Sequence, residues 1–172
     1  MKGYKKTLLW ILSIILIFLL FITWYQYEFS MDPVTSFYVN SGHLSTKLLI
    51  ATQGSDFKNA VTAEIIDHYK QDSVYMEIID VSELNHINPE DYTALVIIHT
   101  WEKWKPPLEV KTFVERTSSQ LDKIIVLTTS GSGDSKMKTV DAITGESRLE
   151  NVTSYSSEII TRLEPILKIR VK

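Results

Sequence analysis

The sequence predicts an α/β domain, a three-layer, doubly wound parallel sheet, behind one N-terminal transmembrane helix. Three observations lead to this fold class. An uncharged apolar run covers residues 8–24. Two further apolar runs, at 93–99 and 123–128, have the composition of strands that are buried on both faces. Segments with helical periodicity alternate with these and other strand-like runs, and this alternation is typical of a parallel sheet covered on both sides.

The apolar run at residues 8–24 predicts a membrane anchor. A helix of this length reaches ~26 Å, close to the ~30 Å hydrocarbon core of a bilayer. Trp10 lies near one end and Trp24 and Tyr25 at the other, where aromatic rings favour the membrane interface. The alternative is a cleaved signal peptide, but no small-residue cleavage site follows the run. We therefore expect residues 1–29 to form a short stub and an uncleaved anchor that contacts the lipid bilayer through residues 8–24.

Charges around the anchor predict its orientation. Lys2, Lys5 and Lys6 precede the run, and the next basic residue after it is Lys47. Because cationic flanks stay in the cytoplasm, we expect a single-pass protein of the cell membrane with a cytoplasmic N-terminus and an extracytoplasmic domain. The chain has 18 basic and 21 acidic residues, and without the three lysines and one glutamate of the first 29 residues the net charge is −5.

Several classes of chemistry lack the residues they need. The acidic balance gives no support for nucleic-acid binding, which requires a basic face. The chain has no cysteine, which excludes thiol catalysis, disulfides and cysteine-ligated metals. Its four histidines show no metal-ligand spacing, so no metal site is predicted.

The soluble part begins with a polar stretch. Residues 30–46 contain several turn formers and predict a linker to a domain over 47–172. A short apolar strand is expected at 48–52, followed by an amphipathic helix over 56–70. The apolar face of this helix is formed by Phe57, Val61, Ile65 and Tyr69.

The middle of the domain continues the alternation. Residues 74–81 are β-rich, and 82–92 predict a polar connection with at most one helical turn. The buried strand at 93–99 follows, and Pro107 can begin the next helix because proline suits the first helical position. The buried strand at 123–128 comes after it.

The last part is harder to assign. If residues 140–144 form a fifth strand, only 129–139 connect it to the fourth, whereas a parallel crossover usually needs a dozen or more residues. We expect a short edge strand here; an antiparallel strand or a helix over 137–143 are the alternatives. Thr153 can cap a final helix, which Pro165 should end or kink.

Three loops come together at one edge of such a sheet. They are "TQGSDFKN" after the first strand, "HTWEKWKPP" after the third and "TTSGSGDS" after the fourth. In open parallel sheets ligands bind at the carboxyl ends of the strands, beside the switch in strand order. We therefore expect a site to be built from these loops.

The same three loops carry a resemblance to the flavodoxin-like family. From Lys47 onward, about three quarters of the chain, the order of elements is similar to that family. In flavodoxin-like proteins a first loop of the form T/S-x-T-G-x-T wraps the phosphate of flavin mononucleotide (FMN), and the other two loops flank the isoalloxazine ring. Gly54 matches the family glycine, while Ala51, Gln53 and Asp56 stand at the three hydroxyl positions.

This resemblance implies a set of FMN-binding residues. The first loop would hold the phosphate, the tryptophans of the second would stack on the ring, and the glycines of the third would meet its pyrimidine edge. The predicted cofactor-binding residues are Thr52, Gln53, Gly54, Ser55, Lys58, Asn59, Thr100, Trp101, Trp104, Ser130, Gly131, Ser132 and Gly133.

Each loop also has a simpler interpretation. Ser55 can cap the following helix, and Asp56 can complement its dipole while opposing a phosphate in the same place. One tryptophan can cover the sheet edge, and the third loop can be a flexible turn. His99, at a strand end, is either a donor to a ring carbonyl or a structural residue.

Residues 141–147, "DAITGES", share Asp141, Thr144, Gly145 and Ser147 with a motif of flavoproteins that carry covalent flavin. Glu146 replaces the small residue of that motif and the surrounding domain does not resemble that family, so a tight turn after a strand is the expected explanation.

Two functions follow from the whole pattern. The first is a membrane-anchored FMN protein in electron transfer or quinone or flavin reduction, with a redox or membrane-protein partner. The alternative is a cofactor-less, flavodoxin-like interaction module outside the membrane.

Overall fold

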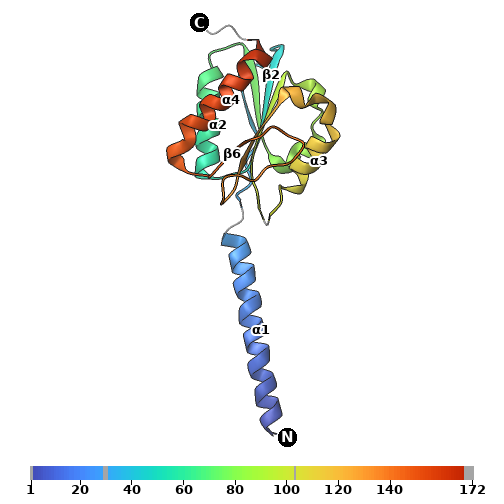
Figure 1. The fold of residues 1–172 in the computed structure, drawn as a ribbon, viewed down its shortest axis with the longest axis vertical. Coiled ribbons are helices and arrows are strands. Elements are labelled where there is room, and N and C mark those ends of the chain that lie inside the picture. The colour runs from blue at the N-terminus through green and yellow to red at the C-terminus, as the bar shows by residue number, and fades with distance from the viewer. Residues whose placement is uncertain (1, 29–30, 103, 169–172) are drawn as a thin grey trace. The chain divides into compact units, whose positions relative to one another are not determined.

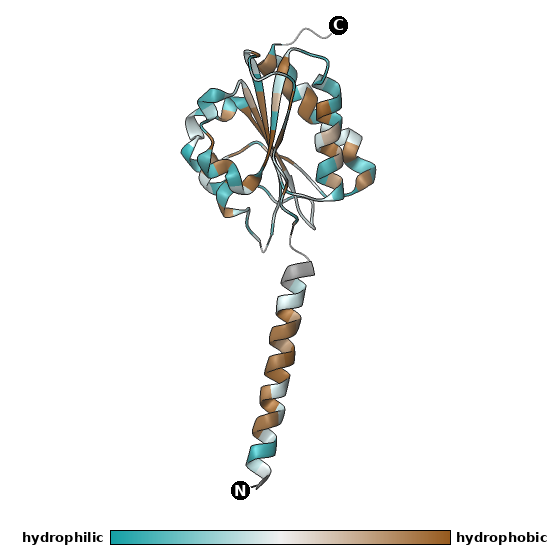
Figure 2. Cartoon of the chain, turned by 180° about the vertical axis from the view of Figure 1, so that it is seen from behind, coloured by the Kyte–Doolittle hydropathy of each residue, from teal (hydrophilic) through white to brown (hydrophobic). Residues whose placement is uncertain are grey.

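The structure is a computed structural model that describes residues 2–28, 31–102 and 104–168. It contains two compact units, residues 1–31 and 32–172, which we describe separately (Figure 1). In the first unit, helix α1 (Lys2–Glu28) is apolar along most of its length (Figure 2). Its segment Gly3–Tyr25 is long and apolar enough to cross a membrane, and it contains the predicted run 8–24.

The second unit is built on a six-stranded, mostly parallel sheet in the part of the chain that is described. The strands are β1 (Phe37–Val39), β2 (Thr46–Thr52), β3 (Val74–Asp80), β4 (Ala94–Thr100), β5 (Ile124–Thr129) and β6 (Ile143–Gly145). Their order in the sheet is β1-β3-β2-β4-β5-β6. Strands β2 to β6 are parallel, and β1 pairs antiparallel with β3 at one edge. The strand order therefore switches direction between β2 and β4.

Helices cover both faces of the sheet. Helices α2 (Asp56–Tyr69) and α4 (Val152–Leu167) lie on one face, and α3 (Leu108–Arg116) and the short 3-10 helix η1 (Val81–His86) lie on the other (Figure 1). Alternate residues of β2, β4 and β5 enter one or the other of two buried clusters, as the pleat requires. In β4, Val96 and Ile98 pack towards α2 and α4, whereas Leu95 and Ile97 pack towards α3. This explains why the strand is apolar throughout.

The structure differs from the expectation at one edge of the sheet and in two connecting segments. Residues 37–39, expected in a linker, form β1, because the segment pairs with the free edge of β3. The connection 82–92 contains two 3-10 helices, η1 and η2 (Pro89–Asp91). Pro107, expected at the first helical position, is instead the N-cap residue of α3, which runs from Leu108 to Arg116 and is followed by the 3-10 helix η3 (Ser118–Lys123).

The last strand agrees with the expected short edge strand, whereas the last helix differs from its predictions at both ends. Strand β6 is a short edge strand and is parallel to β5, and the crossover over 130–142 reaches it without a helix. Thr153 is not the cap of α4, because the 3-10 helix η4 (Leu149–Asn151) leads directly into the helix and places Asn151 at the N-cap. Pro165 lies inside α4, which continues to Leu167, so of the two predicted effects of this proline, an end or a kink, the helix does not end at position 165.

Candidate functional site

The first loop joins β2 to α2 by a capped turn. Ser55 is the N-cap of α2, and its hydroxyl accepts a hydrogen bond from the backbone N–H of Lys58 at 3.3 Å. Asp56 is the first residue of the helix, where its carboxylate complements the positive end of the helix dipole. Both residues therefore have the roles that the capping interpretation assigned to them.

Gly54 is covered by a part of the chain far from it in sequence. Its backbone N–H donates to the carbonyl oxygen of Asp32 at 2.8 Å. A Cβ added at Gly54 would lie 2.5 Å from that oxygen, so only glycine permits this approach. In the family that the loop resembles, this glycine serves the FMN phosphate. Here the chain itself uses the N–H group.

Gln53 closes the gap between the first and second loops. Its side-chain carbonyl accepts from the backbone N–H of Thr100 at 2.7 Å, and its amide nitrogen donates to Glu102 at 3.2 Å. The residue is only 8% exposed. Because β2 and β4 are neighbours at the switch in strand order, this bridge lies where an open sheet would have its ligand crevice. The Gln53 side chain therefore links the first and second loops at this edge of the sheet.

Lys58 is fully buried at the start of α2, with its Nζ 3.4 Å from the hydroxyl of Ser55. Burial lowers the pKa of this amine to about 8, against the opposing effect of the Glu102 carboxylate. Thr52 is also buried, and its hydroxyl donates a hydrogen bond to the backbone carbonyl oxygen of Gln53 at 3.2 Å. Asn59, in contrast, is exposed on α2.

His99 is a structural residue of the β4–β5 pair. The Nδ1 atom lies 3.3 Å from the carbonyl oxygen of Thr100, which can only accept, so Nδ1 carries the proton. Nε2 then accepts from the Thr128 hydroxyl at 3.0 Å. Burial lowers the pKa of His99 to about 4, and the imidazole is therefore neutral at pH 7. Beside it, the hydroxyls of Thr100 and Thr129 are 3.0 Å apart.

The third loop folds onto itself and onto β6. Ser130 is buried, and its backbone N–H donates to the carbonyl of Gly145 at 3.0 Å. Gly133 has a φ of 72° and donates its N–H to the carbonyl of Ser130 at 3.2 Å, while Ser132 bonds to Asp134. Gly131 is exposed. The glycine at position 133 therefore serves a turn, because this φ suits glycine.

The two tryptophans of the second loop have different environments. Trp101 is half-buried and packs against the cluster on the α3 side of the sheet. Trp104 is 92% exposed, with a φ of 60°, between Glu102 and Lys105, whose backbones are hydrogen-bonded to each other at 2.9 and 3.0 Å. The structure does not bring both indoles to a common site.

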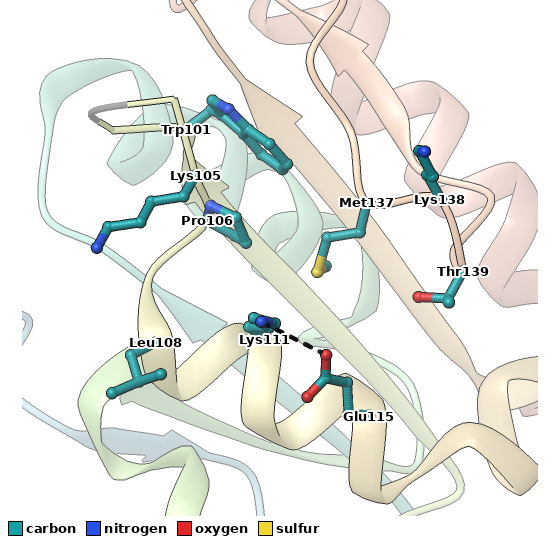
Figure 3. Close-up of a pocket in the computed structure, with 9 residues that line it drawn as sticks. All are labelled: Trp101, Lys105, Pro106, Leu108, Lys111, Glu115, Met137, Lys138 and Thr139. Atoms are coloured by element: carbon teal, nitrogen blue, oxygen red, sulfur yellow. Dashed lines mark ion pairs between the residues drawn. The ribbon is translucent and has the colours of Figure 1, made fainter.

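Trp101 instead lines a groove that the sequence did not indicate. The groove runs between α3 and the crossover 130–142, with a volume of about 460 Å³ (Figure 3). It is lined by Trp101, Lys105, Pro106, Leu108, Lys111, Glu115, Met137, Lys138 and Thr139. These residues come from two segments that carry no shared motif, so sequence spacing gave no signal.

Within residues 2–28, 31–102 and 104–168, no group of three or more histidine, aspartate or glutamate side chains is arranged to hold a metal ion. Comparison with known proteins finds no family model that matches the chain and no curated protein that is similar to it.

Proposed function

We propose that the chain is a membrane-tethered, flavodoxin-like interaction module that works without FMN at the carboxyl edge of its sheet. One observation carries this proposal: the N–H of Gly54 is bonded to the carbonyl of Asp32. An FMN phosphate at a helix N-terminus depends on such N–H groups. To bind there, the phosphate would have to displace Asp32 and approach the carboxylate of Asp56.

The strand order supports the flavodoxin-like part of the proposal. Without β1, the parallel strands follow the order β3-β2-β4-β5-β6, which corresponds to the flavodoxin order 2-1-3-4-5. This fold hosts many unrelated functions, so the assignment of function rests on the site and not on the scaffold.

The location follows from charge and hydropathy. Helix α1 would be a single membrane span, with Lys2, Lys5 and Lys6 in the cytoplasm and residues 32–172 outside the cell membrane. An enzymatic reporter fused to the C-terminus tests this orientation. Alkaline phosphatase, which is active only outside the cytoplasm, should be active, and a cytoplasmic reporter at the same position should be silent. The opposite pattern would reverse the proposed orientation.

The visible spectrum tests the absence of flavin. Residues 30–172, purified after expression in a flavin-replete host, should be colourless. Titration of FMN should not quench flavin fluorescence in a saturable way, and riboflavin, which lacks the phosphate, serves as the control. A yellow protein, or saturable quenching by FMN but not by riboflavin, would overturn the proposal.

A second candidate is an FMN protein in electron transfer or quinone or flavin reduction, as the sequence resemblance implies. The third loop favours it: Gly131 is exposed, and an added Cβ there would meet no described atom within 4 Å, so a ring edge has access to this backbone. In this case the bound flavin supplies the redox chemistry and the protein positions it. The same spectrum distinguishes the two candidates.

A further inference from the structure

We propose that the groove beside α3 is a binding site for small anionic amphiphiles, that is, an aromatic-sized apolar body with one carboxylate, sulfonate or phosphate group. This inference rests on the proposed interaction module and deepens it by naming its ligand class. The groove shares Trp101, Lys105 and Pro106 with the second loop of the carboxyl edge, and its other lining residues come from α3 and from the crossover 130–142.

The groove exists because one helix is missing from the usual pattern. In the crossover between β5 and β6, residues 130–142 form no helix. The crossover instead packs against the buried cluster on the α3 side of the sheet, through Met137, Val140 and Ala142. The flank of α3 that a helix would cover remains open, and Leu108 at its start is 69% exposed. The groove is therefore a consequence of the topology.

Part of the groove is apolar and includes an aromatic ring. Figure 3 shows the side chains of Trp101 and Met137 pointing into the space above Lys111, with Pro106 beside them. A flat apolar ligand can stack on the indole and contact the polarizable sulfur of Met137. A volume of about 460 Å³ lies within the range of small-molecule sites, which argues for a ligand of this size and not for a protein segment.

The charge of the groove opposes that of its domain. Lys105, Lys111 and Lys138 line it together with one carboxylate, Glu115, whereas the chain from residue 30 onward has a net charge of −5. The Nζ atom of Lys111 lies 3.8 Å from a carboxylate oxygen of Glu115, and both side chains are more than half exposed. Such a pair is weak, so a ligand anion can replace Glu115 as the partner of Lys111. The local positive field selects an anion over a neutral analogue.

Equilibrium dialysis with a defined probe tests this proposal. The full chain in nanodiscs of zwitterionic lipid is dialysed against 2-naphthalenesulfonate, with empty nanodiscs as the blank. Saturable binding at one site per chain is expected. The neutral isostere 2-naphthalenesulfonamide should bind at least several-fold more weakly. Equal binding of both compounds, or no saturable binding of the sulfonate, would overturn the proposal.

Three variants locate the site. K111Q should weaken sulfonate binding about two- to fivefold, and the triple variant K105Q/K111Q/K138Q about tenfold or more. E115Q should strengthen it about twofold, because the competing carboxylate is removed. The matched control is K70Q, since Lys70 is also a half-exposed lysine, paired with Asp67 at 2.8 Å. If K70Q and K111Q have the same effect, the anion does not bind in this groove.

The sulfonate-binding test and the flavin test can fail separately. A yellow protein would refute the cofactor-free function, and the effects of K111Q and E115Q on sulfonate binding would still report on the groove, because Lys111 and Glu115 lie in α3 and not in the three loops of the carboxyl edge. A failure of sulfonate binding in a colourless protein would refute only the ligand class.

Discussion

The backbone N–H of Gly54 donates a hydrogen bond to the carbonyl oxygen of Asp32 at 2.8 Å. This bond joins the segment before β1 to the turn between β2 and α2. It closes the one turn whose sequence most resembles a phosphate-binding loop. The same contact explains why position 54 is glycine, because a side chain would collide with Asp32.

G54A should destabilise the domain by about 1–3 kcal/mol, because the new Cβ would lie 2.5 Å from the Asp32 carbonyl oxygen. The matched control is G131A, where an added Cβ meets no described atom within 4 Å. Urea unfolding of residues 30–172, followed by circular dichroism, measures both. Equal stability of G54A and wild type would show that the Asp32 segment is not packed on this turn.

Q53A should cost about 1–3 kcal/mol of unfolding free energy. The substitution leaves the backbone N–H of Thr100 without its acceptor and separates the first loop from Glu102. N59A, at an exposed position of α2, should change stability by less than about 0.5 kcal/mol. The same unfolding measurement applies, and a loss no larger than that of N59A would argue against the bridge.

The buried His99 should make the domain sensitive to acid. Its folded pKa of about 4 lies below the ordinary value of 6.5, so the unfolded chain binds the proton first as the pH falls. Stability should therefore fall by about 2 kcal/mol from this group between about pH 7 and pH 5. H99Q should remove that part of the pH dependence. If the unfolding free energies of H99Q and wild type fall in parallel, His99 is not buried in its neutral form.

Gly145 and Tyr155 should be coupled. A Cβ at position 145 would lie 1.6 Å from the hydroxyl oxygen of Tyr155, so G145A must push the ring out or shift β6. We expect G145A to destabilise by about 1–3 kcal/mol in the wild type and by much less in a Y155L background. A double-mutant cycle of unfolding free energies measures this, and additive effects would contradict the packing of the phenol on β6.

Local patterns predicted the local features well. The continuous apolar runs at 93–99 and 123–128 correspond to β4 and β5, because strands buried on both faces have few alternatives. The sequence also predicted the capping role of Ser55, because an N-cap requires a suitable hydroxyl directly before a segment with helical periodicity.

The features that decide the function depend on distant parts of the chain. Strand β1 has three residues and no clear periodicity, and Asp32 carries no motif, so their contacts with β3 and Gly54 were not visible. The groove beside α3 arises from the absence of a helix in the crossover 130–142, which leaves its walls to two unrelated segments. Sequence spacing reports neighbours within an element and not those brought together by topology.

The central claim, that the chain itself occupies the N–H of Gly54, is tested most directly by hydrogen exchange at that amide. Residues 30–172 labelled with ¹⁵N-glycine contain five of the six glycines of the chain, so each amide can be resolved by NMR. The account predicts that the Gly54 amide is protected without ligand and that added FMN changes neither its exchange rate nor its chemical shift. An amide that exchanges as fast as the exposed Gly131, and becomes protected only when FMN is added, would contradict it.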